Sequence, residues 1–358
     1  MRCRRAKSLV LHWTDKGLMA TNFIAQNSVT LTPSGFNILS KADDWITVAK
    51  LSEMLSEYEC DSAIEGLKEL LDSGLLVVEG DELEKLDTKY NSSWEWSVYA
   101  GLHCFTSKDV QYRTTEECID FLIERRQESP SPELFLESNQ YEFCLPEPEM
   151  DSKLLDIMYR RRSIRKWKKQ SINKQQLSNI LYSGFGVTAF VEHKHLGILP
   201  LTTTPSGGAR NPYEAYVIAN DVDGLSQGIY HYSGLYRSLQ FVTKLNVLPS
   251  DMLGKQQWAD DAPVIILCVA TWKRTMWKYP HAGAYRVVLI EAGHIAQNIL
   301  LAATDENLAG VPTCALGDKF IEDALGLDRI EQAAIHAIAL GHPKEEHFPW
   351  TKIAVRST

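Results

Sequence analysis

The chain has 358 residues and a formal net charge of -9, and 44% of its residues are hydrophobic while 23% are charged. This composition is that of a globular protein long enough for two or more domains, and its acidic balance argues against non-specific binding to DNA or RNA. The apolar run at residues 8–13 is too short for a signal peptide or a membrane-spanning helix. Dispersed cysteines without a CxxC pair favour reduced thiols, so we expect a cytoplasmic protein.

The N-terminal part of the chain is predicted to be a winged-helix-like α/β unit. Short helices are expected after Thr32 and after Thr47, and a third helix over residues 61–73, where apolar residues recur at helical spacing. Residues 75–78 are expected to form a strand, and residues 79–81 the turn of a hairpin. Three helices followed by a hairpin is the order of elements in a winged helix.

The next part is less regular. Aromatic residues between 94 and 105 predict an apolar, partly extended stretch, and residues 116–126 predict a helix. Proline-rich breakers follow at 129–132 and 145–148. We therefore expect a winged-helix-like domain, a connecting segment and a third domain, at residues 1–85, 86–150 and 151–358.

After residue 150 the pattern becomes that of an α+β domain. A helix at 287–304 is apolar on most faces, so we expect it to be buried in the domain or at a subunit interface. The other predicted elements are helices at 153–161 and 174–185 and strands at 215–219, 228–232, 263–270 and 333–340.

A basic motif follows the first of these helices. Arg161, Arg162, Ser163 and Arg165 place three cations and a hydroxyl within a short stretch. Guanidinium groups bind phosphate in bidentate fashion, which makes the motif a candidate phosphate site. A solvated basic helix end is the alternative, because basic runs are common on protein surfaces.

A glycine-rich loop precedes the strand at 215–219. Gly207 and Gly208 follow Ser206, and two glycines allow close backbone approach to a flat ligand and expose amide groups. A plain turn explains the loop equally well. Leu316 and Gly317 form a second glycine turn after a buried strand, and alone it indicates no more than an αβ connection.

Lys278 and Tyr279 stand just before the long apolar helix. An amine beside a phenol can act as a general base if its surroundings favour that role. The pair alone is ordinary surface composition. His231, His281 and His294 fall within these motifs, but no metal-ligand spacing emerges among them, so no metal is expected.

Taken in order and spacing, the three main motifs resemble the SagB-type flavin-dependent dehydrogenases, a branch of the nitroreductase superfamily. The resemblance covers roughly residues 150–345 and implies an α+β, nitroreductase-like fold that binds FMN. It also implies roles for the motif residues. Arg161, Ser163 and Arg165, with Arg162 beside them, hold the FMN phosphate. Ser206, Gly207 and Gly208 cross the pyrimidine side of the flavin, and Glu214 matches an acidic residue of the family. Leu316 and Gly317 approach the reactive face.

The same resemblance implies an activity. Lys278 and Tyr279 match a catalytic pair of members that oxidise peptide azolines to thiazoles or oxazoles. The substrate would be a ribosomally made precursor peptide whose leader binds the N-terminal domain, and further expectations are a cyclodehydratase complex and a homodimer. Because the predicted third helix is acidic, the N-terminal domain is not expected to read DNA. Two alternatives stay open: an NAD(P)H-dependent reductase of dehydroamino acids or nitro compounds, and a non-catalytic peptide-binding scaffold.

Overall fold

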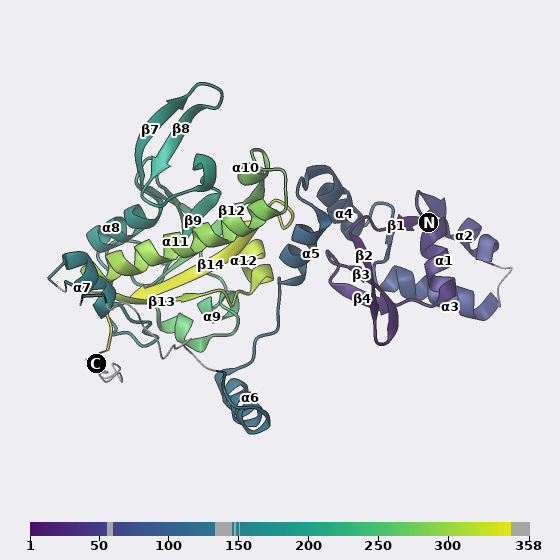
Figure 1. The fold of residues 1–358 in the computed structure, drawn as a ribbon, viewed down its shortest axis with the longest axis horizontal. Coiled ribbons are helices and arrows are strands. Elements are labelled where there is room, and N and C mark those ends of the chain that lie inside the picture. The colour runs from purple at the N-terminus through teal and green to yellow at the C-terminus, as the bar shows by residue number, and fades with distance from the viewer. Residues whose placement is uncertain (56–59, 133–144, 147, 150, 345–358) are drawn as a thin grey trace. The chain divides into compact units, whose positions relative to one another are not determined.

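The computed structural model describes residues 1–55, 60–132, 145–146, 148–149 and 151–344 (Figure 1). The chain divides into two compact units. Unit 1 comprises Met1–Lys108, Thr271–Val288 and Asp328–Ala333, and unit 2 comprises the remainder. The boundaries expected at residues 85 and 150 stay a prediction, and residues 133–144 and 345–358 of the expected domains lie outside the described residues.

Unit 1 contains two three-stranded sheets. In the first, β1 (Arg2–Arg5) lies between β5 (Ile46–Thr47) and β6 (Leu76–Val78), and both pairings are antiparallel. The second sheet is an antiparallel meander of β2 (Leu9–Thr14), β3 (Gly17–Asn22) and β4 (Asn27–Thr30). The sequence patterns did not predict the meander.

The three helices predicted for the N-terminal part are confirmed as α1 (Pro33–Lys41), α2 (Val48–Leu55) and α3 (Cys60–Asp72). Hydroxyl caps start two of them: the Thr32 side chain accepts from the Gly35 amide at 3.1 Å, and the Thr47 side chain accepts from the Lys50 amide at 3.2 Å. Their apolar faces share one core with the first sheet, including Ile38, Leu51, Leu67 and Leu76.

The hairpin expected after the third helix is wrong. Strand β6 pairs with β1 instead of a following strand, and the chain turns directly into helix α4 (Glu82–Ser93). The physical reason is a helix cap, since the Asp81 side chain accepts a hydrogen bond from the Glu84 amide at 2.6 Å. The winged-helix-like assignment therefore rests on α1–α3 and the first sheet.

The prediction of a partly extended stretch between residues 94 and 105 is also wrong in part. Helix α5 (Val98–Thr106) covers it, with Ala100, Gly101, Cys104 and Phe105 buried. These positions are one, three and four residues apart, which is helical spacing. The helix expected at 116–126 is confirmed as α6 (Thr115–Glu128), which begins with a capping box between Thr114 and Glu117.

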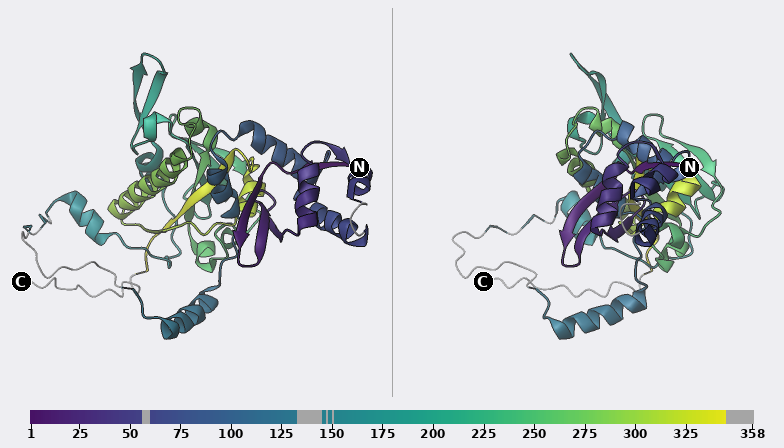
Figure 2. Two further views of the ribbon diagram at one scale, coloured as in Figure 1. Left: turned by 45° about the vertical axis from the view of Figure 1, so that its right-hand side comes forward. Right: turned by 90° about the vertical axis from the view of Figure 1, so that its right-hand side faces the viewer.

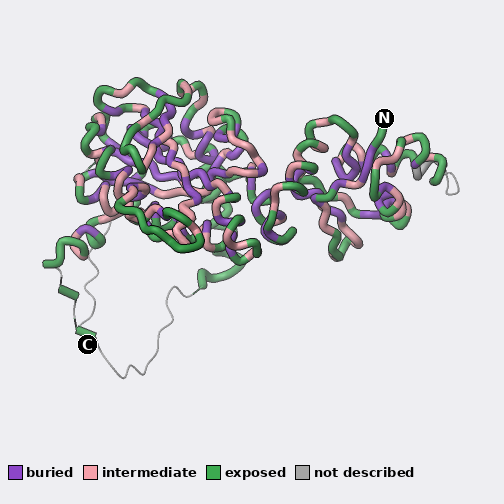
Figure 3. The backbone as a smooth tube through the Cα atoms, turned by 90° about the horizontal axis from the view of Figure 1, so that it is seen from above, coloured by how far each residue is buried: buried purple, intermediate pink, exposed green. Residues whose placement is uncertain are grey.

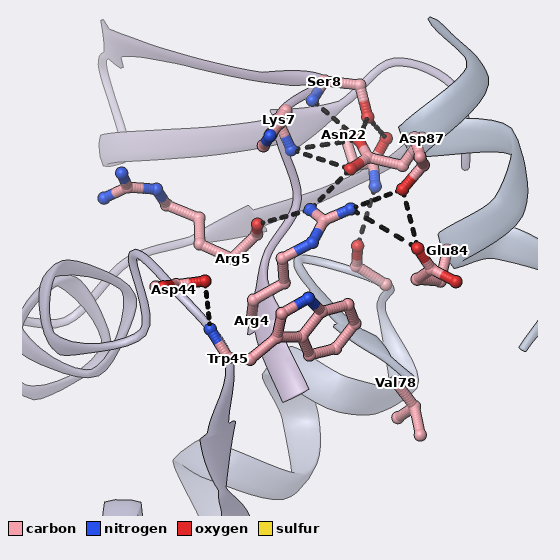
Figure 4. A network of polar contacts seen from close by, with 12 residues as sticks. Arg4, Arg5, Lys7, Ser8, Asn22, Asp44, Trp45, Val78, Glu84 and Asp87 are labelled. Atoms are coloured by element: carbon pink, nitrogen blue, oxygen red, sulfur yellow. Dashed lines mark hydrogen bonds and ion pairs between the residues drawn. The ribbon is translucent and has the colours of Figure 1, made fainter. Parts of the chain in front are cut away.

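A buried carboxylate ties α4 to the start of the chain (Figure 4). Asp87 is fully buried and accepts from the Arg4 guanidinium at 2.7 Å, from the Ser8 hydroxyl at 2.7 Å and from the backbone amides of Lys7 and Ser8. Every oxygen of this carboxylate is therefore hydrogen-bonded, and one partner carries the opposite charge. That is the condition under which a buried charge can be tolerated.

Unit 2 is built on a six-stranded sheet in the order β11-β10-β9-β12-β14-β13. Its strands are β9 (Tyr213–Ala219), β10 (Gly228–Ser233), β11 (Ser238–Thr243), β12 (Val264–Thr271), β13 (Ala309–Thr313) and β14 (Gln332–Gly341). The strands predicted at 215–219, 228–232, 263–270 and 333–340 are confirmed by β9, β10, β12 and β14. A separate two-stranded hairpin, β7 (Val187–His193) with β8 (Gly197–Thr202), projects beyond the sheet (Figure 2).

Helices cover both faces of the large sheet. The long helix α11 (Gly283–Asp305) runs across one face (Figure 1) and packs against α8 (Lys174–Phe185), where Gly184 leaves room for Ile299. The other face forms a core with α9 (Pro249–Met252) and α12 (Asp318–Leu325). Figure 3 shows the buried residues concentrated inside the fold and the exposed residues around them. Helix α7 (Lys153–Arg160), α8 and α11 confirm the three predicted helices.

Helix α11 is also the described helix that is long and apolar enough to cross a membrane by length and composition. Half of its most apolar window is buried inside the protein, as in the core helix of a globular domain.

Loss of the Asp87 carboxylate should destabilise unit 1. Asp87→Ala removes the carboxylate that lies 2.7 Å from the buried Arg4 guanidinium and leaves it Glu84, at 3.9 Å, as the charged partner, so we expect the free energy of unfolding to fall by about 3–5 kcal/mol. Glu79→Ala breaks the exposed Arg2–Glu79 pair and is the control, with an expected loss of about 0–1 kcal/mol. Urea unfolding followed by tryptophan fluorescence measures both, and equal stability of the two variants would contradict the role given to Asp87.

Candidate functional site

The basic motif lies in an extended segment after α7. Ser163 pairs in parallel with Gly310 of β13, and the Ile164 amide donates to the Gly310 carbonyl at 3.3 Å. Ile164 is turned into the protein, whereas Ser163 and Arg165 are exposed, as expected where an extended chain alternates its side chains. Arg161 is half-buried. The segment therefore presents a hydroxyl and guanidinium groups from one short stretch.

Arg162 is held differently from its neighbours. Its Nη1 donates to the backbone carbonyls of Tyr159 at 2.5 Å and of Arg161 at 2.6 Å, and its guanidinium lies 5.7 Å from the Tyr159 ring centroid. It also lines a pocket of 390 Å³ together with Arg160 and Ile164. Arg162 thus closes the end of α7, and its contact with a cofactor stays a prediction.

The glycine loop has an unusual backbone. Gly208, Ala209 and Asn211 have φ angles of 65°, 54° and 44°, all in the left-handed region. Glycine adopts that region at little cost and asparagine tolerates it, so the strain of the loop lies chiefly at Ala209. Asn211 stabilises the loop locally, because its backbone amide donates to the Ser206 hydroxyl at 2.9 Å and its side-chain oxygen accepts from the Thr202 hydroxyl at 2.9 Å.

Glu291 of helix α11 is hydrogen-bonded to the same loop. Its carboxylate accepts from the Gly207 amide at 2.6 Å and from the Ser206 hydroxyl at 3.0 Å, and the residue is 5% exposed. In this structure the hydroxyl of Ser206 and the amide of Gly207 are therefore engaged inside the protein. Their part in cofactor contact stays a prediction.

Asn298 forms a second support two turns along α11. Its side-chain amide donates to the Thr204 hydroxyl at 3.0 Å and to the Thr203 carbonyl at 3.4 Å. Glu291 and Asn298 are seven residues apart and so lie on one face of the helix. Sequence reasoning gave neither residue a role. The available signal was an acid and an amide on the buried face of an apolar helix.

Burial raises the pKa of the Glu291 carboxyl above its ordinary value. The Gly207 amide, the Ser206 hydroxyl and His294 act in the opposite direction without cancelling the effect. The hydrogen-bond donors thus compensate only in part for the water that the carboxylate lost on burial.

Lys278 and Tyr279 belong to unit 1, whereas the basic motif and the glycine loop belong to unit 2. The pair follows the short helix α10 (Trp272–Met276), and both side chains are partly exposed. Lys278 Nζ lies 5.4 Å from the centroid of the Tyr279 ring. The two groups are therefore neighbours in space as well as in sequence.

The second glycine turn is constrained by packing. Leu316 is 4% exposed and belongs to the core between the sheet and α12. The Gly317 amide donates to the Met252 carbonyl at 2.9 Å, and a Cβ at Gly317 would lie 2.1 Å from the Asp251 carbonyl oxygen. Close approach to α9 explains the glycine, and cofactor contact by this turn stays a prediction.

Two further polar pairs lie in unit 2. Glu214 Oε2 is 2.6 Å from His231 Nε2, on the neighbouring strands β9 and β10. Cys314 Sγ is 2.9 Å from His336 Nδ1. Burial raises the pKa of the Cys314 thiol and lowers the pKa of His336, which favours the neutral forms of both.

Comparison with known proteins gives one family and several relatives. The sequence model of the Nitroreductase family matches residues 158–342. The putative nitroreductase MJ1384 of Methanocaldococcus jannaschii is 34% identical over 186 residues, which are 51% of this chain and 89% of that protein. The trifolitoxin-processing protein TfxB of Rhizobium leguminosarum bv. trifolii is 31% identical over 150 residues, which are 40% of this chain and 40% of TfxB.

One solved structure also resembles this chain over most of its length. It is the E. coli microcin synthetase McbBCD complex with truncated pro-MccB17 bound, in which one chain matches with a TM-score of 0.50 and 16% identity. The match covers 75% of this chain and 99% of that chain. At this identity the likeness concerns the fold, and the expected α+β, nitroreductase-like fold is confirmed.

Glu291→Gln should change how stability depends on pH. With a raised pKa, the folded chain keeps a proton that the unfolded chain releases near its ordinary value of about 4.5. That contribution to stability is present below the ordinary pKa and is lost as pH rises through the folded-state pKa. The free energy of unfolding should therefore fall more between about pH 4 and pH 8 in the wild type than in Glu291→Gln.

Urea unfolding at a series of pH values measures this difference. Glu322→Gln removes another buried glutamate of unit 2 and is the matched control. Wild type and Glu291→Gln curves that run parallel over the whole range would show that Glu291 does not titrate in this way.

Proposed function

We propose that this chain, which belongs to the nitroreductase family, is an FMN-dependent dehydrogenase that oxidises azolines of a ribosomally made peptide to azoles. Two observations support the peptide substrate. One relative is named for processing of the peptide trifolitoxin, and Lys278-Tyr279 forms a spatial pair of a base and a phenol. As a member of this family the chain is an oxidoreductase.

The residues of unit 2 fit FMN. Arg161, Ser163 and Arg165 would hold its phosphate, because guanidinium and hydroxyl groups pair with phosphate oxygens and the segment that carries them is exposed. The glycine loop fits a flat ring, since Gly207 and Gly208 present backbone without side chains. One terminal phosphate suits this motif better than the pyrophosphate of a dinucleotide.

The chemistry assigns a proton transfer to the chain itself. Conversion of an azoline to an azole removes a proton from the α-carbon and a hydride from the β-carbon. The adjacent imine and carbonyl make the α-proton acidic, and Lys278 with Tyr279 would accept it. When bound, FMN would supply the hydride acceptor, and dioxygen would take the two electrons afterwards.

A second function is favoured by a different observation. The relative that this chain covers over 89% of its length is a putative nitroreductase, which suggests reduction of nitro compounds or dehydroamino acids with NAD(P)H. Mass spectrometry separates the two directions. A peptide substrate loses two hydrogens under the first proposal. Under the second, a dehydroamino acid gains two hydrogens, whereas a nitro compound loses oxygen as water when it is reduced to the nitroso compound or the hydroxylamine.

The partners follow from the same proposal. Unit 1 would bind the leader of the precursor peptide, because β6 lies at the edge of its sheet and an extended peptide can add a strand there. The chain would act in the cytoplasm as a homodimer together with a cyclodehydratase. Titration with a synthetic leader peptide and with duplex DNA tests the binding, and tight, salt-sensitive DNA binding would contradict it.

Arg161→Ala and Arg165→Ala should each weaken FMN binding. Loss of a charge-assisted hydrogen bond costs about 1.5–3 kcal/mol, which raises Kd roughly ten- to a hundredfold. Lys169→Ala removes an exposed cation of the same basic stretch and is the control. Quenching of flavin fluorescence on titration with FMN and with FAD measures the affinity. A protein that binds neither flavin would contradict the assignment of the cofactor.

Light scattering of the flavin-loaded protein measures its mass. A flavin-loaded monomer would contradict the proposed homodimer.

Lys278→Ala and Tyr279→Phe should lose turnover and keep the flavin. Removal of a positioned base lowers the rate by about 10²–10⁴-fold. The flavin content should be unchanged, because the residues assigned to FMN lie elsewhere in the chain. The assay is loss of two hydrogens from a synthetic peptide that carries one thiazoline. Full activity in both variants would remove the acid–base role of the pair.

A further inference from the structure

The turn that carries Lys278 and Tyr279 is folded as part of unit 1. Residues 271–288 cluster with residues 1–108 in that unit. The backbone amides of Lys278 and Tyr279 both donate to the Thr275 carbonyl, at 3.2 Å and 3.0 Å, so the turn continues directly from α10. The pair is therefore presented by the same unit that contains the N-terminal helices.

Trp96 makes a direct contact with this turn. Its indole Nε1 donates to the backbone carbonyl of Tyr279 at 2.9 Å, and the residue is 4% exposed. The His281 amide donates to the same carbonyl at 2.8 Å. Two donors on one carbonyl hold the peptide plane that follows Tyr279, and with it the direction of the Tyr279 Cα–Cβ bond from which the phenol extends.

Aromatic packing fixes Trp96 in turn. Its ring meets those of Trp94, Trp272 and Tyr285 edge-on, at centroid distances of 5.5, 6.0 and 5.8 Å. Close-packed rings of this kind leave little freedom to rotate. Trp96 lies in the short connection between α4 and α5. The position of those two helices is therefore coupled to the position of Tyr279 through one indole hydrogen bond.

We propose that Trp96 is a positioning residue for Lys278 and Tyr279, so that the unit assigned to peptide recognition also sets the geometry of the acid–base pair. The inference rests on the proposed function, because it requires the pair to act in catalysis. It makes the connection between α4 and α5 part of the catalytic apparatus. Nothing in the residues around Trp96 assigns it to flavin or peptide binding.

Trp96→Phe tests the proposal, because it keeps an aromatic ring and removes the N–H donor. Trp94→Phe is the matched control: Trp94 packs in the same cluster, and its Nε1 donates to the nearby Ser97 carbonyl at 3.5 Å. With the synthetic thiazoline peptide, kcat should fall roughly 10–100-fold in Trp96→Phe, since small misplacements of reacting groups carry losses of this size. Trp94→Phe should stay near wild type.

The other readouts separate positioning from loss of structure. In Trp96→Phe the KM for the thiazoline peptide, the FMN content and the far-ultraviolet circular dichroism should match those of Trp94→Phe. A merely structural role would change these together with kcat. Trp96→His retains a ring N–H donor and should recover part of the kcat that Trp96→Phe loses. If Trp96→Phe does not fold, kcat is compared between Trp96→His and Trp96→Leu instead.

The outcomes distinguish this inference from the proposed function. Wild-type kcat in Trp96→Phe, or an equal loss in both phenylalanine variants, overturns the positioning role while Lys278→Ala and Tyr279→Phe remain inactive. If Lys278→Ala and Tyr279→Phe are themselves fully active, the catalytic role of the pair is wrong and the positioning role is overturned with it.

Discussion

The hydrogen bonds of the Glu291 carboxylate are the constraint on which the candidate cofactor site depends. Gly208, Ala209 and Asn211 all adopt left-handed backbone, which costs free energy chiefly at Ala209. The bonds from Gly207 and Ser206 to Glu291 offset that cost, because the loop would lose them on relaxing. Helix α11 therefore determines the shape of a loop that lies more than eighty residues earlier in the chain.

Sequence patterns predicted the elements in which one periodicity dominates. Helix α3 and strand β12 are of this kind, since their apolar residues recur at helical spacing or form a continuous buried run. Strand β2 was not predicted because Leu11 and Trp13, both large and apolar, are 45% and 79% exposed, which reverses the usual inside–outside pattern. Helix α5 was not predicted because Trp94 and Trp96 suggested an extended stretch. These two residues belong to the connection before the helix.

The candidate site was predictable where it consists of a contiguous motif. Arg161 to Arg165, the glycine loop and Lys278-Tyr279 can each be read from adjacent residues. Glu291, Asn298 and Trp96 could not be assigned in that way, because their roles depend on which distant backbone atoms they face. The Trp96 indole, for example, reaches a carbonyl 183 residues away. Such contacts are a property of the tertiary structure, and the sequence shows only that a polar group stands among apolar neighbours.

Asp87 of unit 1 and Glu291 of unit 2 are both buried carboxylates, and the two are satisfied by different chemistry. Asp87 faces the Arg4 guanidinium at 2.7 Å, so a fixed opposite charge accompanies it. The donors shown for Glu291 within the described residues are an amide and a hydroxyl, both neutral, and desolvation outweighs them, which raises the pKa of Glu291. Neutral donors orient a carboxylate without fixing its charge.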